Sequence, residues 1–364
     1  MDIKVITRHG PSNYGSLLQS IATIKIVERL GHKCEIIDYR RKDERGLKAV
    51  LTALNQKENW RSNLIKKFIY VLVRFPEECI AERFFDKYRD KHLKTTETCN
   101  THKDLKRLTA DVFMTGSDQV WGPLLCNKYD DAYFLSFVNN TKKIAYAASF
   151  GRTEFNKSIL SEYKSLLSQY NAITVRESSA VDLLKQLDVR CNGQVLDPTL
   201  LLTGKEWSTL IEKNICHKYV LVYQIHNDTK LNDYAVRFAK SKGLPLIRIS
   251  AYLHQIMRGG KFVYLPTVGE FLAYIKQCTY FITDSFHGTA FAINFNKQFI
   301  EILPNTKTGS RNQSILKLTG LEGRIINDYN DFSIADSIID YDKVNDIIDS
   351  ERQKSIGLLK AMIE

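Results

Sequence analysis

Short apolar segments alternate with helical segments along most of this chain, and this alternation constrains the fold more than any other feature. At the start, Ile3–Thr7 has the pattern of a strand, Leu17–Leu30 has apolar residues at helical spacing, and Cys34–Tyr39 is a second strand. Gly31 stands where a helix commonly ends. A strand, a helix and a second strand within this length predict a βαβ unit with a crossover between parallel strands.

The same alternation continues in two further blocks. In the first block we expect strands at Asp111–Thr115, Lys143–Ser149, Ala172–Val175 and Gln194–Leu196, and a helix at Ser178–Leu187. In the second block we expect strands at Tyr219–Gln224, Pro245–Ser250, Tyr280–Thr283 and Gln298–Leu303, and helices at Leu231–Ser241, Val268–Gln277, His287–Phe295, Gln313–Leu318 and Tyr341–Met362. The pattern predicts an α/β fold of two Rossmann-like lobes that face a cleft.

The predicted domains follow from these blocks. Residues 1–203 form an N-terminal Rossmann-like lobe with a basic helical insertion at about 41–110, residues 218–340 form a C-terminal Rossmann-like lobe, and residues 341–364 form a C-terminal helix. Two domains also suit 364 residues, because this length exceeds what one hydrophobic core usually supports. Ligands in such folds bind at the carboxyl ends of strands, so the loops there are the candidate sites.

Cysteine usage and hydropathy indicate a cytoplasmic protein. The seven cysteines form no CxxC pair, so a reduced compartment and no metal centre are expected. The N-terminal apolar run is too short for a signal peptide, and no run of about 18 uncharged apolar residues suggests a membrane span. We expect no cofactor beyond the substrates.

The positive charge is concentrated in the insertion. From Arg40 to Arg107 there are 18 Lys and Arg against ten Asp and Glu. Such a segment is either a solvated helical face or a contact for an anionic substrate, a membrane or nucleic acid. If residues 60–75 are helical, five apolar residues share one stripe and four cations lie off it. The stripe is Trp60, Leu64, Phe68, Val71 and Phe75, and the cations are Arg61, Lys66, Lys67 and Arg74.

This stripe fits two structures. It is typical of a helix that packs on a core, and equally of a helix that lies in the interface of an anionic bilayer. We expect peripheral contact with the inner face of the membrane and no nucleic-acid partner.

Two strand-end loops lie in the first half of the chain. The loop Arg8–Ser16 contains Asn13 and Gly15, and its N–H groups either hold an anion or sugar hydroxyl or form an ordinary tight turn. It lacks the spacing of a dinucleotide or Walker loop. In Thr115–Trp121, Gly116 permits a sharp turn, and three polar side chains have the short reach that suits sugar hydroxyls: Ser117, Asp118 and Gln119. Asp118 could instead serve only as a helix cap.

Two further strand-end loops carry charged or titratable residues. Arg176 either binds a carboxylate or phosphate or pairs structurally with Glu177. The last loop gives the clearest signal, because an apolar strand leads directly into a turn and a helix. Its polar members are Asp284, Ser285, His287 and Gly288. An imidazole at a helix N-terminus lies beside free N–H donors, which suits phosphate binding and proton transfer.

Six motifs along residues 1–330 resemble, in this order, those of the polysaccharide pyruvyl transferase family. They are Asn13-x-Gly15, Thr115–Trp121, Ala145–Gly151, Val175-Arg176-Glu177, Leu196–Thr199 and Thr283–Gly288. The resemblance implies a fold similar to that of B-type glycosyltransferases. It also implies phosphoenolpyruvate as donor, a pair of saccharide hydroxyls as acceptor and a pyruvyl ketal as product. Family members act in making bacterial capsule, exopolysaccharide or cell-wall polymers, whose acceptors are often carried on lipids.

The chain departs from the family at one position. Members carry an arginine two residues before the histidine of the last motif, and here that position is Ser285. The anionic donor therefore needs another partner, and the candidates are Arg8, Arg176, Arg248 and Arg311. By the chemistry that the resemblance implies, His287 is the expected proton donor and Asp118 the expected base.

Two alternatives remain open from the sequence. One is a B-type glycosyltransferase that uses a nucleotide-sugar, with Glu270 or Asp284 on the ribose hydroxyls. The other is a non-catalytic sugar-binding member of the family, which Ser285 favours.

Overall fold

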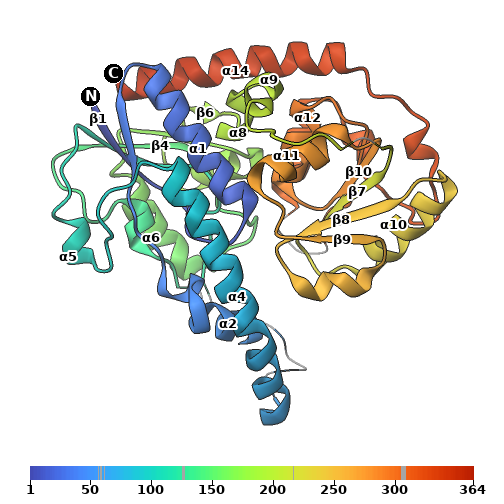
Figure 1. Ribbon diagram of the computed structural model, residues 1–364. Helices are drawn as coiled ribbons and strands as arrows, with labels where there is room; N and C mark the ends of the chain where they lie inside the picture. The colour runs from blue at the N-terminus through green and yellow to red at the C-terminus, as the bar shows by residue number, and fades with distance from the viewer. Residues whose placement is uncertain (56, 58–59, 61, 125–127, 216, 305–308) are drawn as a thin grey trace.

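Two parallel β-sheets form the body of the protein, and helices flank both (Figure 1). The computed structural model describes residues 1–55, 57, 60, 62–124, 128–215, 217–304 and 309–364. The first sheet has six strands in the order β2-β1-β3-β4-β5-β6. Their bounds are β1 Asp2–Ile6, β2 Lys33–Ile36, β3 Val112–Thr115, β4 Lys142–Ala148, β5 Ala172–Val175 and β6 Gly193–Gln194.

The second sheet has five strands in the order β11-β10-β7-β8-β9. Their bounds are β7 Val220–Tyr223, β8 Leu246–Ser250, β9 Lys261–Tyr264, β10 Tyr280–Thr283 and β11 Phe299–Glu301. The alternation in the sequence does not predict β9. This strand lies at the edge of the sheet, with Lys261 exposed and the other residues half-buried. It therefore lacks the fully apolar pattern of the central strands.

Helices connect the strands in each sheet. In chain order they are α1 Tyr14–Arg29, α6 Lys157–Leu167, α7 Ser178–Gln186, α8 Pro198–Leu201, α9 Gly204–Ser208, α10 Thr229–Ser241, α11 Val268–Gln277, α12 Phe286–Asn294 and α13 Ser310–Leu318. Short 3-10 helices are η3 Asp131–Phe134, η4 Leu253–Arg258, η5 Glu322–Arg324 and η6 Ser333–Ala335. The sequence analysis missed α6, although its buried residues Ile159, Tyr163 and Leu167 recur every four positions, as on one face of a helix.

The chain between β2 and β3 is the basic insertion, and most of it is helical. It contains η1 Lys42–Glu44, α2 Gly46–Asn55, α4 Leu64–His92 and α5 His102–Leu105. α2 covers one side of α4 through a small cluster of Val50, Leu54 and Tyr70. None of the described helices is long and apolar enough to cross a membrane.

The apolar stripe expected on residues 60–75 is wrong in detail. Val71 packs against the cluster under α2, whereas Leu64 and Phe68 are exposed. Trp60 stacks at an angle on Tyr70, with ring centroids 5.8 Å apart. The residues of the stripe therefore face different surroundings, because the position of α2 decides which side of α4 is covered.

One hydrophobic core connects the two lobes. Tyr14 at the start of α1 stacks on Phe271 of α11, with ring centroids 4.3 Å apart. Its hydroxyl donates a hydrogen bond to the carbonyl oxygen of Pro266 at 2.5 Å. The last helix, α14 Tyr341–Ile363, runs along both lobes and ends on the first (Figure 1). There Lys142 Nζ donates to the carbonyl oxygen of Ile363 at 3.0 Å.

Each sheet has one switch point, where the direction in which successive strands are added reverses. The first sheet grows in opposite directions from β1, so its switch point lies between β1 and β3, and that of the second sheet lies between β7 and β10. Ligands bind beyond the carboxyl ends of the strands at such points. The topology therefore directs attention to the loops that follow these four strands.

Candidate active site

A cavity of about 250 Å³ lies between the lobes, and the loops from both switch points line it. Its lining residues are Arg8, Pro11, Asn13, Ser16, Asp118, Gln119, Ile225, His226, Tyr252, Ser285, Phe286, His287 and Arg311. Among the residues proposed from the sequence, Arg8, Asn13, Asp118, Gln119, Ser285, His287 and Arg311 thus lie together. The sequence analysis had not proposed His226 or Tyr252, which follow strands whose loops carry no recognisable motif.

The first loop is held rigidly at the N-terminus of α1. The Asn13 side chain caps this helix and accepts hydrogen bonds from Gly15 N at 2.8 Å and Ser16 N at 3.2 Å. Arg89, fully buried on α4, donates to the carbonyl oxygens of His9 and Pro11, both at 3.3 Å. The insertion thus fixes the loop from behind, and the first turn of α1 is free to face the cavity.

Asp118 is the carboxylate of this cavity. Its backbone has a φ of 76°, a left-handed conformation that few residues other than glycine adopt and that recurs at functional sites. Ser16 Oγ donates to Oδ2 and Gln119 N donates to Oδ1, both at 2.8 Å. Burial raises the pKa of Asp118, but the positive charges of Arg8, Arg176 and Arg311, joined at low pH by protonated His287, outweigh it and lower the pKa below its usual range. Asp118 is therefore ionised.

His287 lies directly over Gly15. A Cβ at Gly15 would lie 2.0 Å from His287 Nδ1. The ring can therefore occupy this position only because residue 15 is a glycine. Nε2 is buried without a hydrogen-bond partner among the described residues, and Asp197 Oδ2 is 3.9 Å from it. Burial lowers the pKa of His287, although Asp197 and Asp118 oppose the shift. The ring is neutral at pH 7 and its Nε2 is available.

Arg311 brings a weakly compensated positive charge to the cavity. The Gln119 amide, with its oxygen turned toward Arg311, accepts from Nη1 at 3.2 Å and also from Nη2. Nε is buried without a hydrogen-bond partner among the described residues. Burial, with the nearby charge of Arg176, lowers the pKa of Arg311 to about 10. An anion in the cavity would relieve this unfavourable burial.

Arg8 is the second arginine of the cavity. Its Nη2 lies 2.6 Å from Glu44 Oε1, and this ion pair ties the loop after β1 to the insertion. Phe286, on the opposite lobe, has the Arg176 guanidinium 4.3 Å and the Arg311 guanidinium 6.0 Å from its ring centroid. An aromatic face thus holds two guanidinium groups beside one cavity.

Arg176 and Ser117 lie behind the cavity in a buried network. Asp197 Oδ2 accepts from Arg176 Nη1 at 2.6 Å and from Ser117 Oγ at 2.7 Å, and its Oδ1 accepts from Thr199 N at 2.9 Å. The sequence analysis placed Asp197 in a motif but gave it no role. The sequence feature that could have identified Asp197 is its position directly after a predicted strand. Asp197 joins three of the motifs, and Arg176 serves it rather than lining the cavity.

Two further candidates are used for structural contacts. Both carboxylate oxygens of Asp284 accept backbone N–H bonds, from Ile225 at 2.7 Å and His226 at 2.9 Å. Arg248 lies outside the cavity, where Nη1 donates to Gln224 Oε1 at 3.1 Å and Nη2 to the carbonyl oxygen of Arg258 at 3.2 Å. Neither residue lines the cavity, because folding gives each a nearer partner, and their assignment to substrate binding stays a prediction.

The remaining proposed glycines allow close contacts below the cavity. A Cβ at Gly288 would lie 2.4 Å from Thr283 Oγ1, and one at Gly116 would lie 3.0 Å from Val5 Cγ1. Gly288 therefore lets the first turn of α12 lie close to the end of β10, and Gly116 lets the loop after β3 lie close to β1.

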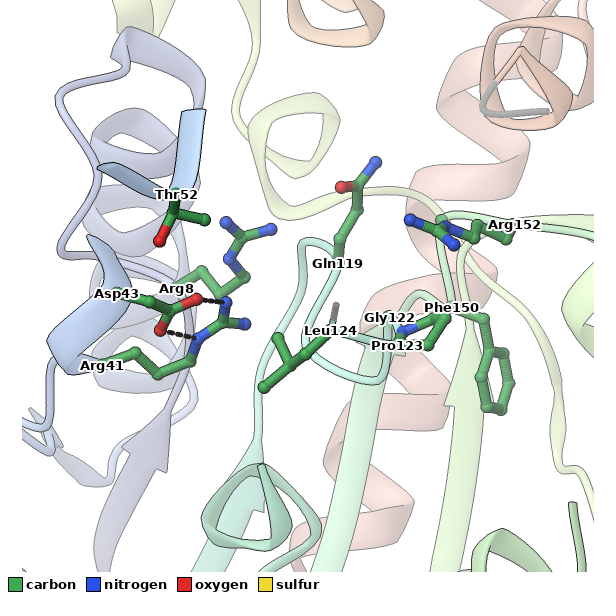
Figure 2. Close-up of a pocket in the computed structure, with 11 residues that line it drawn as sticks. Arg8, Arg41, Asp43, Thr52, Gln119, Gly122, Pro123, Leu124, Phe150 and Arg152 are labelled. Atoms are coloured by element: carbon green, nitrogen blue, oxygen red, sulfur yellow. Dashed lines mark hydrogen bonds and ion pairs between the residues drawn. The ribbon is translucent and has the colours of Figure 1, made fainter. Parts of the chain in front are cut away.

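A second cavity, of about 190 Å³, shares Arg8 and Gln119 with the first. Figure 2 shows Arg8 and Arg41 on one side of this cavity and Arg152 on the other, with Gln119 between them. Arg41 pairs with Asp43, with Nη2 2.5 Å from Oδ2. The sequence pattern does not predict this group, since the insertion contributes Arg41, Asp43 and Thr52 from outside any strand-end loop.

One group of metal-type side chains occurs elsewhere among the described residues. His102, Asp130 and Asp131 have their ligand atoms within 4.8 Å of one another. His102 Nε2 is 2.9 Å from Asp131 Oδ1, and Asp130 Oδ2 accepts from Tyr39 Oη at 2.9 Å. His102 and Asp131 thus pair with each other and Asp130 with Tyr39, and none of the three metal-type side chains lines either cavity.

Solved structures with the same overall fold include three UDP-N-acetylglucosamine 2-epimerases. A putative enzyme from Listeria monocytogenes has a TM-score of 0.51 and 10% identity, covering 97% of this chain and 91% of its own. The enzyme from Methanocaldococcus jannaschii has a TM-score of 0.51 and 12% identity, covering 96% and 92%. A third has a TM-score of 0.52 and 10% identity, covering 99% and 95%. The expected fold, similar to that of B-type glycosyltransferases, is confirmed.

No curated protein matches the chain. The family model described as polysaccharide pyruvyl transferase matches residues 13–306. This match includes the cavity-lining residues from Asn13 to His287, in both lobes, whereas Arg8, Pro11 and Arg311 of the lining lie outside it. The chain therefore belongs to the polysaccharide pyruvyl transferase family, a family of transferases.

Proposed function

We propose that the protein transfers the pyruvyl group of phosphoenolpyruvate to two hydroxyls of a saccharide. The observation that supports this most is the composition of the interlobe cavity. It combines two arginines, Arg8 and Arg311, with an ionised carboxylate, Asp118, and an imidazole, His287. Phosphoenolpyruvate needs cationic partners for its carboxylate and phosphate, and its transfer needs groups that move protons.

Arg8 and Arg311 would bind the anionic groups of the donor in place of the arginine that family members carry at position 285. Ser285 instead caps α12, since its Oγ accepts from Gly288 N at 3.3 Å. The first turns of α1 and α12 both meet the cavity, through Asn13 and Ser285. Helix N-termini present unpaired N–H groups to anions, so they add to the arginines.

The protons of the proposed transfer balance between the donor, the two saccharide hydroxyls and the side chains of the cavity. The methylene carbon of the donor gains a proton and the neighbouring carbon becomes cationic. One saccharide hydroxyl adds there and loses its proton, then phosphate leaves and the second hydroxyl closes the ketal. One of the two hydroxyl protons replaces the proton given to the methylene carbon, and the other leaves with phosphate. His287 would deliver the first proton and Asp118 would accept from the attacking hydroxyl.

The second cavity is the natural place for the saccharide. It adjoins the first at Arg8 and Gln119, and it offers the polar side chains of Arg41, Asp43 and Thr52. Charged and amide groups of this kind suit the hydroxyls of a sugar. Donor and acceptor would then meet beside Asp118, which follows β3 and precedes Gln119.

A nucleotide-sugar donor is less well supported, because the acidic residues expected on its ribose are occupied. Asp284 accepts two backbone N–H bonds, and Glu270 Oε2 accepts from Thr267 N at 3.0 Å in the capping box of α11. Neither carboxylate lines the interlobe cavity. The UDP-sugar chemistry in the names of the similar epimerases is therefore not assigned to this chain.

Ligand-dependent thermal unfolding tests the proposal without knowledge of the acceptor. A ligand present at about 100 times its Kd stabilises the folded state by about 2.7 kcal/mol. We expect phosphoenolpyruvate to raise Tm with increasing concentration, and UDP-sugars to have no such effect. Stabilisation by a UDP-sugar alone would favour the glycosyltransferase alternative, and no response to either would favour a non-catalytic sugar-binding protein.

Two variants distinguish donor binding in the cavity from a general effect of removing a positive charge. Arg311→Gln removes the weakly compensated arginine and should abolish the shift with phosphoenolpyruvate. Arg237→Gln removes an arginine on α10 that pairs with Asp233 outside the cavity, and it should leave the shift intact. Equal responses in the two variants would place the donor elsewhere.

A further inference from the structure

The first half of α4 carries a bare apolar face. Leu64, Ile65, Phe68, Ile69, Leu72 and Val73 are 79%, 71%, 68%, 47%, 61% and 62% exposed, respectively. Their spacing of one and four residues places all six on one side of the helix. Figure 1 shows this end of α4 projecting from the N-terminal lobe, beyond both sheets. A contiguous apolar face of this kind marks an interaction surface.

The other side of α4 already has its partner. Tyr70 is buried with Val50 and Leu54 of α2, and Val71 packs against them. Farther along the helix, Glu77 Oε1 accepts from Leu253 N at 2.5 Å, which ties α4 to η4 of the C-terminal lobe. The contacts that Tyr70, Val71 and Glu77 make with the rest of the protein thus lie away from the exposed face of α4.

The charges around this face have one sign. Residues 60–76 contain Arg61, Lys66, Lys67 and Arg74 and no Asp or Glu. On a helix, Lys66 and Lys67 fall on the two flanks of the apolar face. Because every ionic side chain here is positive, a second copy of the same segment would bring like charges together. An anionic surface that also takes up apolar side chains is the complementary partner.

We propose that the exposed face of α4 docks the protein onto an anionic lipid bilayer. The six apolar side chains enter the boundary between headgroups and acyl chains, and Lys66 and Lys67 contact the headgroups. Arg89 near the other end of the same helix binds the loop that lines the interlobe cavity. Docking through α4 would therefore set the position of the cavity relative to the membrane surface, whatever reaction the cavity carries out.

The test is co-sedimentation of the full chain with vesicles. We expect the protein to pellet with phosphatidylcholine–phosphatidylglycerol vesicles at low salt, less at high salt, and little with phosphatidylcholine alone. Replacing Leu64, Phe68 and Leu72 together by Gln should abolish pelleting. Lys66→Gln with Lys67→Gln should weaken binding roughly 25-fold, since each cation near an anionic surface contributes a factor of about five.

Ile338→Gln is the matched control, because Ile338 is 82% exposed and lies outside α4. It should bind vesicles like the unchanged protein, and Tm should show that all variants fold. The proposal is overturned if the triple α4 variant pellets as well as the control, or if the unchanged protein stays in the supernatant. It is equally overturned if the α4 face instead forms a dimer in lipid-free solution that the triple variant dissociates. Thermal stabilisation by phosphoenolpyruvate is a separate measurement, so failure of either proposal is recognised independently.

Discussion

At the scale of single residues, the cavity is a place where charges are buried close together. Burial raises the pKa of Asp118 and lowers those of His287 and Arg311, while the neighbouring opposite charges oppose each shift. For Asp118 the charges of the arginines outweigh burial, and the pKa is lowered. For His287 burial outweighs the nearby carboxylates, and the pKa is lowered. The free protein therefore holds an ionised carboxylate and a neutral imidazole at pH 7.

This state changes when an anion binds. A phosphate or carboxylate beside His287 favours the imidazolium and raises its pKa. Between the lower pKa of the free protein and the higher pKa of the complex, the complex then holds one more proton. Binding of phosphoenolpyruvate should therefore be coupled to proton uptake, and its affinity should fall as pH rises through this window. Calorimetric titration in two buffers of different ionisation enthalpy measures the uptake.

The control for this prediction is His287→Gln. Protonation of phosphoenolpyruvate itself contributes equally to both proteins, so it cancels in the comparison. The variant should bind with less proton uptake, and His287→Ala should lower turnover roughly 10²–10⁴-fold, the usual range for acid–base catalysis. Identical proton uptake in the two proteins would exclude His287 as the group that titrates.

At the scale of elements, two helices from different lobes meet at their N-termini. α1 begins after Asn13 and α12 after Ser285, and Gly15 receives the His287 ring at a distance that leaves no space for a Cβ. The contact joins the carboxyl end of β1 to that of β10. It makes the position of the imidazole depend on the packing of the two lobes.

Gly15→Ala should therefore displace His287. A Cβ 2.0 Å from Nδ1 forces the ring away, so we expect turnover to fall toward that of His287→Ala. Strain of this kind also destabilises by about 1–3 kcal/mol. In the His287→Ala background the ring is absent, and Gly15→Ala should no longer destabilise. Thermal unfolding of the four proteins in this cycle measures the coupling.

Gly357→Ala is the matched control within a helix. Gly357 lies in α14, and a Cβ there would meet no atom within 4 Å. Alanine should leave turnover unchanged and stabilise the protein by roughly 0.5–1 kcal/mol, because glycine loses more chain entropy on folding. If Gly15→Ala behaved in the same way, His287 would not depend on this contact.

At the scale of the whole molecule, the lobes share one core and the chain end crosses between them. α14 buries Val344, Ile348, Leu359, Met362 and Ile363. Ser355 Oγ accepts from Leu196 N at 3.0 Å, and Arg352 Nε donates to the carbonyl oxygen of Leu200 at 2.9 Å. The helix thus begins on the C-terminal lobe, where Tyr341 Oη donates to the carbonyl oxygen of Lys297, and its second half packs on the first lobe.

This arrangement predicts a single unfolding transition. Leu359→Ala should lower the free energy of unfolding by about 2–5 kcal/mol, as for other buried leucines. Because the core is continuous, the whole calorimetric transition should move to a lower temperature rather than split. Ile338→Ala, at an 82% exposed position, should change the free energy of unfolding by less than about 0.5 kcal/mol. Two separate transitions in Leu359→Ala would show that the lobes unfold independently.

The pattern of residues along the chain was enough to predict the local structure and, through the six motifs, the family. Strands Ala172–Val175 and Tyr280–Thr283 and helix Val268–Gln277 have the predicted bounds. The spacing of apolar residues within a strand or helix shows which of its residues are buried. Residues close together in the sequence are enough to reveal this spacing. The polar loops after β1, β3 and β10 were also visible, because each follows an apolar strand directly.

Which of these side chains lie together could be seen only once the chain is folded. Arg8, Arg176, Arg248 and Arg311 were equivalent in sequence, yet two line the cavity, one pairs with Asp197 and one binds backbone carbonyls. The exposed face of α4 and the return of α14 were hidden for the same reason. The partner of a side chain often lies in a segment that is far away in the sequence. No local sequence pattern therefore shows which charge or apolar surface the side chain contacts after folding.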